Sequence, residues 1–66
     1  MLHGNVKWFD VGRGLGSIEP QDGKEVLVYK NALKRSGIET LTEGQLVAFD
    51  LEYRRGQAVA EDLKVL

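Results

Sequence analysis

The sequence predicts an all-β domain, a five-stranded antiparallel β-barrel that spans residues 1–66. Short runs rich in β-branched and aromatic residues alternate apolar with polar positions, and glycine-containing turn signals separate these runs. Sixty-six residues are also too few for a two-layer sandwich of useful size. Closing the sheet on itself removes its exposed edges and encloses one small core, so a barrel is the fold that these observations favour.

The first two strands are expected in the N-terminal third of the chain. Residues 2–10, LHGNVKWFD, are rich in β-formers and alternate apolar with polar positions. Residues 14–20, GLGSIEP, alternate in the same way, with Leu15 and Ser17 on one face and Ile18 on the other. Together they predict the first hairpin of the barrel.

A third strand and an irregular connection follow. Asp22-Gly23 is a strong hairpin signal, and residues 25–30, EVLVYK, form a β-branched run after it. Residues 31–45 break the alternation. Their first part predicts one helical turn that ends at Gly37, and the remainder predicts a loop.

The last two strands are expected to form a hairpin around Arg54-Arg55-Gly56-Gln57. Residues 46–53, LVAFDLEY, alternate cleanly and come before this turn. The inward set of this strand is predicted to be Val47, Phe49, Leu51 and Tyr53. The outward set is predicted to be Ala48, Asp50 and Glu52. The final run, AVAEDLKVL, closes the sheet.

Charge and composition narrow the classes of function. Nine Lys and Arg residues against ten Asp and Glu residues give a net charge of -1, which argues against tight nonspecific binding to duplex nucleic acid. The chain has no cysteine, no apolar run long enough to span a bilayer and no signal-peptide pattern. We therefore expect a soluble, cytoplasmic protein without a membrane partner. We also expect a monomer.

No pattern in the chain indicates catalysis, a metal site or a cofactor. Residues 12–16, GRGLG, lack the Gly-Lys-Ser/Thr ending and the βαβ context of a phosphate-binding loop. His3 has no partner at a metal-ligand spacing, and neither Ser17 nor Ser36 has a recognisable base beside it. We expect a protein that is not an enzyme and that has no small-molecule substrate.

The outer side of the first three strands combines aromatic and basic residues. The predicted core comprises Val6, Ile18, Val26, Val28, Val47, Phe49 and Leu51. The residues then left outside are Lys7, Trp8, Arg13, Leu15, Ser17, Leu27, Tyr29 and Lys30. Ring faces stack on bases, cations meet phosphates, and glycines at 12, 14 and 16 leave space for a base to approach. The combination indicates a surface for single-stranded nucleic acid.

Several separated motifs give the whole chain a resemblance to the bacterial cold-shock proteins. KWFD is similar to the family's KWFN, RGLGSI to its motif K-G-F-G-F-I, and VLVYK to its motif V-F-V-H-F. The resemblance implies one cold-shock-like domain over residues 1–66, with a five-stranded barrel of the oligonucleotide-binding type (OB-fold). It also implies binding of single-stranded RNA or DNA, pyrimidine-rich by preference. The implied role is that of an RNA chaperone or a regulator of transcription or translation.

Some of the family's binding residues carry over directly. Lys7, Trp8 and Phe9 match the family's pattern, and Arg13 keeps a positive charge where the family has lysine. Tyr29 replaces a histidine and still offers a ring to a base. The resemblance therefore implies that these five residues bind nucleic acid.

Other positions of the family's binding surface are altered in this chain. Leu15, Ser17 and Leu27 replace three phenylalanines of the stacking platform, and Lys30 replaces a fourth. Asp10 replaces an asparagine with a carboxylate that repels phosphate. If each lost ring removes about 1 kcal/mol, three losses weaken binding by about a hundredfold. We expect binding that is weaker and more salt-sensitive than in the family.

A second hypothesis is a diverged or engineered cold-shock-like barrel that has lost nucleic-acid binding and acts as a protein-interaction module. The row Leu15, Leu27 and Ile38 would place an apolar patch where the stacking rings of the family lie. Exposed apolar patches often mark protein interfaces.

Overall fold

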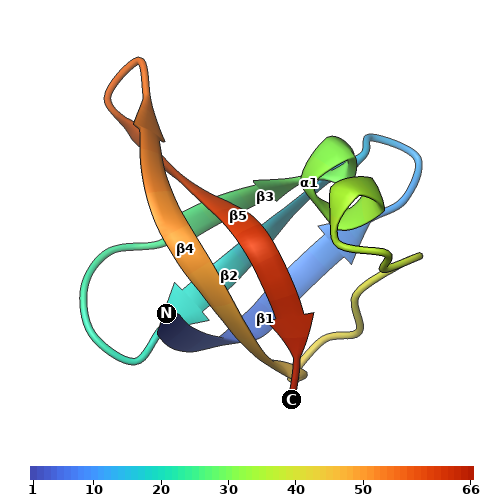
Figure 1. Ribbon diagram of the computed structural model, residues 1–66, viewed down its shortest axis with the longest axis horizontal. Helices are drawn as coiled ribbons and strands as arrows, with labels where there is room; N and C mark the ends of the chain where they lie inside the picture. Colours follow the sequence, from blue (N-terminus) through green and yellow to red (C-terminus); the bar gives the residue numbers. More distant parts are fainter.

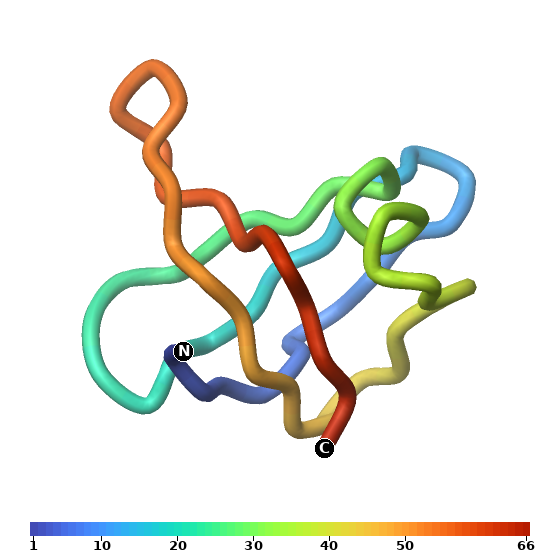
Figure 2. The backbone as a smooth tube through the Cα atoms, in the orientation of Figure 1, coloured from blue at the N-terminus to red at the C-terminus, as the bar shows by residue number.

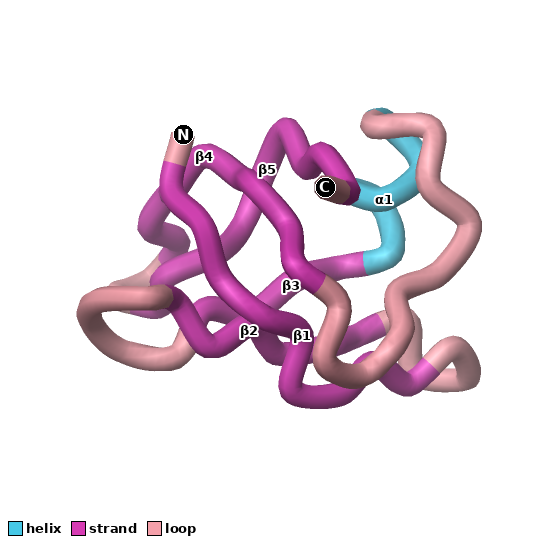
Figure 3. Tube along the Cα trace, turned by 90° about the horizontal axis from the view of Figure 1, so that it is seen from below, coloured by secondary structure: helices cyan, strands magenta, loops and turns pink.

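The computed structural model describes all residues of the protein, 1–66. Its elements are β1 (Leu2–Asp10), β2 (Leu15–Pro20), β3 (Val26–Tyr29), α1 (Lys30–Arg35), β4 (Leu46–Arg54) and β5 (Gln57–Val65). The strands close into a barrel in the order β1-β2-β3-β5-β4, and α1 is the only helix (Figures 1 and 3). The predicted all-β barrel is confirmed.

The seam that closes the barrel lies between β3 and β5. These two strands are parallel and pair through Leu27 and Val59, whereas the other four neighbouring pairs are antiparallel. Strand directions cannot alternate all the way round a closed ring with an odd number of strands, so one neighbouring pair has to be parallel. The antiparallel arrangement expected from the sequence holds for four pairings, and this seam is the exception.

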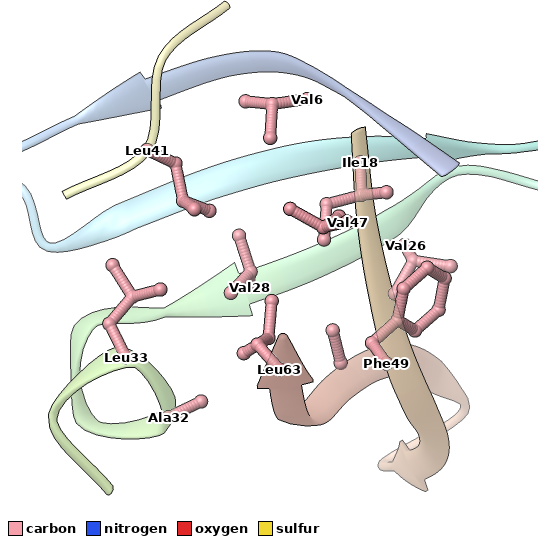
Figure 4. Close-up of a cluster of buried hydrophobic side chains, with 11 residues drawn as sticks. Val6, Ile18, Val26, Val28, Ala32, Leu33, Leu41, Val47, Phe49 and Leu63 are labelled. Atoms are coloured by element: carbon pink, nitrogen blue, oxygen red, sulfur yellow. The ribbon is translucent and has the colours of Figure 1, made fainter. Parts of the chain in front are cut away.

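One apolar cluster fills the barrel (Figure 4). Its members are Val6, Ile18, Val26, Val28, Ala32, Leu33, Leu41, Val47, Phe49, Ala60 and Leu63. All predicted core residues except Leu51 belong to it, and Leu51 is half-buried against its side. The short helix and the loop after it add Ala32, Leu33 and Leu41, which the alternation of the strands did not indicate. The connection between β3 and β4 is therefore part of the core.

The alternation predicted for β4 fails at both ends of the strand. Ala48 was expected outside and is buried, while Tyr53 was expected inside and is 70% exposed. The pairing of β4 with β5 is irregular next to Ala48, where Asp62 and Leu63 both lie opposite Phe49. The extra residue of this bulge belongs to β5, so the bulge breaks the two-residue period of β5 and not that of β4. It does not explain why Ala48 is buried. Tyr53 lies near the tip of the β4–β5 hairpin, which extends beyond the barrel in Figure 1 and leaves no core for its side chain.

A second bulge lies in β1 and changes the direction in which the side chains after it point. Val6 pairs with Ile18, and Trp8 pairs with Ser17, so Lys7 is an extra residue in β1. Strict alternation from the buried Val6 would point Trp8 into the barrel. The bulge instead leaves Lys7 and Trp8 both exposed and turns the next residue, Phe9, toward the core.

Gly16 is the residue of β2 that makes room for this arrangement. It pairs with Phe9, and a Cβ atom at Gly16 would overlap the Phe9 ring and lie 2.8 Å from the carbonyl oxygen of Trp8. The missing side chain therefore lets the ring of Phe9 lie against the backbone of β2.

We predict that Gly16→Ala lowers the free energy of unfolding by about 1–3 kcal/mol, the usual cost of overpacking a tight contact. Urea unfolding followed by Trp8 fluorescence measures this loss. The matched control is Gly12→Ala, because a Cβ there would meet only the flexible Asp10 carboxylate, at 3.3 Å. We expect the control to change stability by less than about 0.5 kcal/mol. Equal losses in the two variants would contradict this account of the bulge.

Candidate nucleic-acid interface

The outer face of β1, β2 and β3 holds two rows of predicted binding residues. The strand pairing places Trp8, Ser17 and Leu27 in one row across the three strands. It places Asp10, Leu15 and Tyr29 in the next row. We call this surface the β1–β3 face, and it also carries Lys7, Arg13 and Lys30. The structure therefore brings together strand residues that lie up to about twenty positions apart in the sequence.

Two rings are available to a ligand on the β1–β3 face. Trp8 is 38% exposed and Tyr29 is 42% exposed, so both present aromatic surface to solvent. Leu15 and Leu27 lie between the rings and are half-buried, so they add apolar contact but no flat surface. Phe9 is half-buried and packs against the core. Of the carried-over aromatic residues, Trp8 and Tyr29 are those with exposed rings.

Ser17 was predicted to lie on the surface, but it is buried. Its side chain is fully buried, and its hydroxyl group donates a hydrogen bond to Oε2 of Glu25. The same Oε2 atom lies 3.7 Å from Nζ of Lys7. Because Ser17 is small and Glu25 reaches over it, a carboxylate occupies the place between Trp8 and Leu27. The expectation that Ser17 is exposed to a ligand is wrong.

Glu25 is a residue of the candidate site that was not predicted from the sequence. It comes directly before β3, and its link to Ser17 spans eight positions. Ser17 lies opposite Leu27, two residues after Glu25, so the signal was present only in the strand register. From its residue type alone, Glu25 is one of many carboxylates that are expected to be solvated.

Asp10 is a second carboxylate on this face, and it pairs with Arg13, the other cation near β1 that was predicted to contact phosphate. Asp10 Oδ1 accepts a hydrogen bond of 3.2 Å from the backbone N–H of Arg13, and Asp10 Oδ2 lies 3.6 Å from Nε of Arg13. Lys7 and Arg13 therefore each have an acidic partner. Both pairs are well exposed, and such pairs contribute at most about 1 kcal/mol. A phosphate group can compete with either carboxylate at that low cost.

Lys30 is the cation of the β1–β3 face that has no acidic partner. It starts α1 and takes part in none of the ion pairs of the structure. Its backbone N–H donates to the carbonyl oxygen of Gly14 at 2.9 Å, and its Cβ lies 3.2 Å from where a Cβ of Gly14 would be. This contact keeps Lys30 beside the β1–β2 turn.

The apolar row of the second hypothesis does not form an exposed patch. Leu15, Leu27 and Ile38 are all half-buried, and Ile38 packs against the core cluster. The large apolar side chains that the face does expose are those of Trp8 and Tyr29. The surface is thus richer in rings and charges than in aliphatic side chains.

The structure shows no group of three or more acidic or histidine side chains placed to hold a metal ion. None of its helices has the length and apolar character needed to cross a bilayer.

Comparison with known proteins places the chain among nucleic-acid-binding domains. Residues 2–66 match the family described as the 'Cold-shock' DNA-binding domain. The major cold shock protein of Streptococcus pyogenes serotype M6 is 46% identical over 52 residues, which cover 79% of this chain and 78% of that protein. The cold shock-like protein CspE of Buchnera aphidicola subsp. Acyrthosiphon pisum is 44% identical over 61 residues, 89% of this chain and 88% of that protein. The cold shock-like protein CspC of Bacillus cereus is 40% identical over 65 residues, 97% of this chain and 100% of that protein.

We predict that Glu25→Gln strengthens the binding of oligothymidine about twofold to fivefold at low salt, because it frees Lys7 from a pair worth up to about 1 kcal/mol. Glutamine can still accept the hydrogen bond from Ser17, so the local structure is kept. Isothermal titration calorimetry measures the change. The matched control is Glu19→Gln, an exposed residue of β2 that takes part in no ion pair. An equal gain in both variants would show that only the total charge matters.

Proposed function

Because the chain belongs to the cold-shock domain family, we propose that its β1–β3 face binds a single strand of RNA or DNA. Nucleic-acid binding of the cold-shock type follows from family membership. The single observation that carries the site assignment is the exposure of Trp8 and Tyr29 on a face that also holds Lys7, Arg13 and Lys30.

The two rings have the role of stacking platforms in this proposal. A base stacked on an aromatic side chain contributes about 1–3 kcal/mol, and every base has a π-face that can stack. Trp8 and Tyr29 lie in neighbouring rows on β1 and β3. One strand of nucleic acid can therefore use both rings, while the cations around them meet its phosphates.

We also propose that binding is weak and strongly salt-dependent. Ser17 is buried beneath the Glu25 carboxylate, and Leu15 and Leu27 provide only half-buried apolar contact. Stacking is thereby restricted to two rings, and Lys7 and Arg13 have to exchange an intramolecular carboxylate for a phosphate. Most of the remaining attraction is electrostatic, which falls steeply as salt rises.

Several finer points remain predictions from the sequence. These are the preference for pyrimidine-rich strands, the role as RNA chaperone or regulator, the monomeric state and the cytoplasmic location. The protein-interaction module is the less favoured candidate, since the aliphatic row that motivated it is half-buried.

The experiment that tests the proposal is a titration of the protein with a short oligothymidine, followed by Trp8 fluorescence at low and near-physiological salt. We expect quenching that saturates at low salt. No quenching at low salt would contradict single-strand binding at this face.

Tyr29→Ala is predicted to weaken oligothymidine binding by about fivefold to a hundredfold, because it removes one of the two stacking rings. The same fluorescence titration measures the loss. The chain offers a matched control in Tyr53→Ala, since Tyr53 is 70% exposed and lies on β4, outside the β1–β3 face. A loss of similar size in the control would show that the effect is not due to stacking at Tyr29.

A further inference from the structure

A groove of about 340 Å³ lies over the seam where β3 runs beside β5. The hairpin between β4 and β5 and the helix α1 stand on either side of this seam (Figure 2). The side chains that matter in it are Tyr29, Arg35, Arg54, Arg55, Gln57 and Glu61. Tyr29 also belongs to the β1–β3 face, so the groove continues that face across the seam.

The side chains that line the groove carry more positive than negative charge. Three arginines line it against one carboxylate, that of Glu61. Arg55 takes part in no ion pair. Glu52 approaches the rim, with Oε1 at 3.7 Å from Nη2 of Arg54, but both side chains are more than half exposed there. In the groove Arg35 and Arg54 share the carboxylate of Glu61. On the β1–β3 face Lys7 and Arg13 each have a carboxylate of their own.

Glu61 fixes two of the arginines in position. It is only 7% exposed, and its Oε1 and Oε2 accept hydrogen bonds from Nη2 of Arg35 at 2.9 Å and from Nη2 of Arg54 at 2.8 Å. Each guanidinium has five N–H donors, so one bond to Glu61 leaves most of them free. The side chains of Arg35 and Arg54 remain 61% and 56% exposed. Their donors are thus held in place and open to a ligand before it arrives.

Arg55 occupies a backbone position that does not favour arginine. Its φ is 53° and that of Gly56 is 79°. A two-residue hairpin turn of type I′ requires a positive φ at both of these central residues. Glycine, asparagine and aspartate are the residues that accept a positive φ most easily. A long cationic side chain in such a position, with no partner within the protein, points to a ligand contact.

We infer that this groove binds a phosphate group of a nucleotide whose base stacks on Tyr29. The inference rests on the proposed function, because a strand that uses Tyr29 on the β1–β3 face extends its backbone into the groove. Arg54 and Arg55 then meet the phosphate, and Glu61 acts as a positioning residue that orients Arg35 and Arg54. Planar guanidinium groups suit the oxygens of a phosphate because they offer two parallel donors.

The test uses oligothymidine of about eight nucleotides, within the usual site size of such a barrel. Arg55→Asn removes the charge and keeps a residue that accepts a positive φ. Loss of one phosphate contact makes the negative slope of log affinity against log salt shallower by about 0.7. Relative to 1 M salt, this corresponds to roughly eightfold weaker binding at 50 mM salt and fourfold at 150 mM. Arg55→Lys keeps the charge and should keep the slope. Lys64→Gln, an exposed residue of β5 outside the groove, is the matched control for loss of one charge.

The outcomes separate this inference from the proposed function. Lower affinity and a shallower salt dependence in Arg55→Asn alone would support the groove. Equal affinities of Arg55→Asn and Lys64→Gln would overturn it. If oligothymidine does not bind at all, NMR titration with thymidine 5′-phosphate decides the matter. Saturable shifts of the Tyr29, Arg55 and Gln57 amides would then support a site for free nucleotides, although the strand-binding proposal had failed. No shifts would overturn the groove as well.

Discussion

The bulge at Lys7 decides which side chains of β1 meet solvent, and the candidate site depends on it. Without the extra residue, the alternation that buries Val6 would also bury Trp8 and expose Phe9. With it, Lys7 and Trp8 are both exposed, and Phe9 packs against the core. Gly16 accepts this arrangement on the neighbouring strand, since any side chain there would meet the ring of Phe9. One local irregularity thus creates a cation beside a ring, which is the pairing that single-stranded nucleic acid needs.

The second constraint is how the charges of the chain neutralise one another. A net charge of -1 suggests little attraction for phosphate, but the charges are not spread evenly. Glu25 and Asp10 each hold a cation of the β1–β3 face through an exposed pair, which a ligand can displace cheaply. Glu61 is buried between two arginines, so its contacts are much more costly to break. In the proposed binding mode, the first kind of pair competes with a ligand, and the second kind positions donors for one.

The strand pattern predicted most of the fold because each side chain reports the environment of its own strand face. Val6, Ile18 and Phe49 are buried as the alternation indicated, and Trp8 and Tyr29 are exposed as the family resemblance implied. The prediction was wrong for Tyr53, which lies on a projecting hairpin, and for Ala48, whose burial the nearby bulge in β5 does not explain. It was also wrong for Ser17, since a residue small enough to be covered does not show in the sequence what covers it.

The sequence by itself determined the number of strands, the barrel, the family and the two rings at the centre of the proposed site. These follow from periodicity and motifs, which are properties of neighbouring residues. Only the tertiary structure decided that Ser17 lies beneath Glu25, and that Arg35 of α1 and Arg54 of β4 share the carboxylate of Glu61. The partners in these contacts are separated by eight, twenty-six and seven positions. Which charges meet across strands depends on register, on bulges and on the closure of the barrel. Residue types along the chain do not encode those distances.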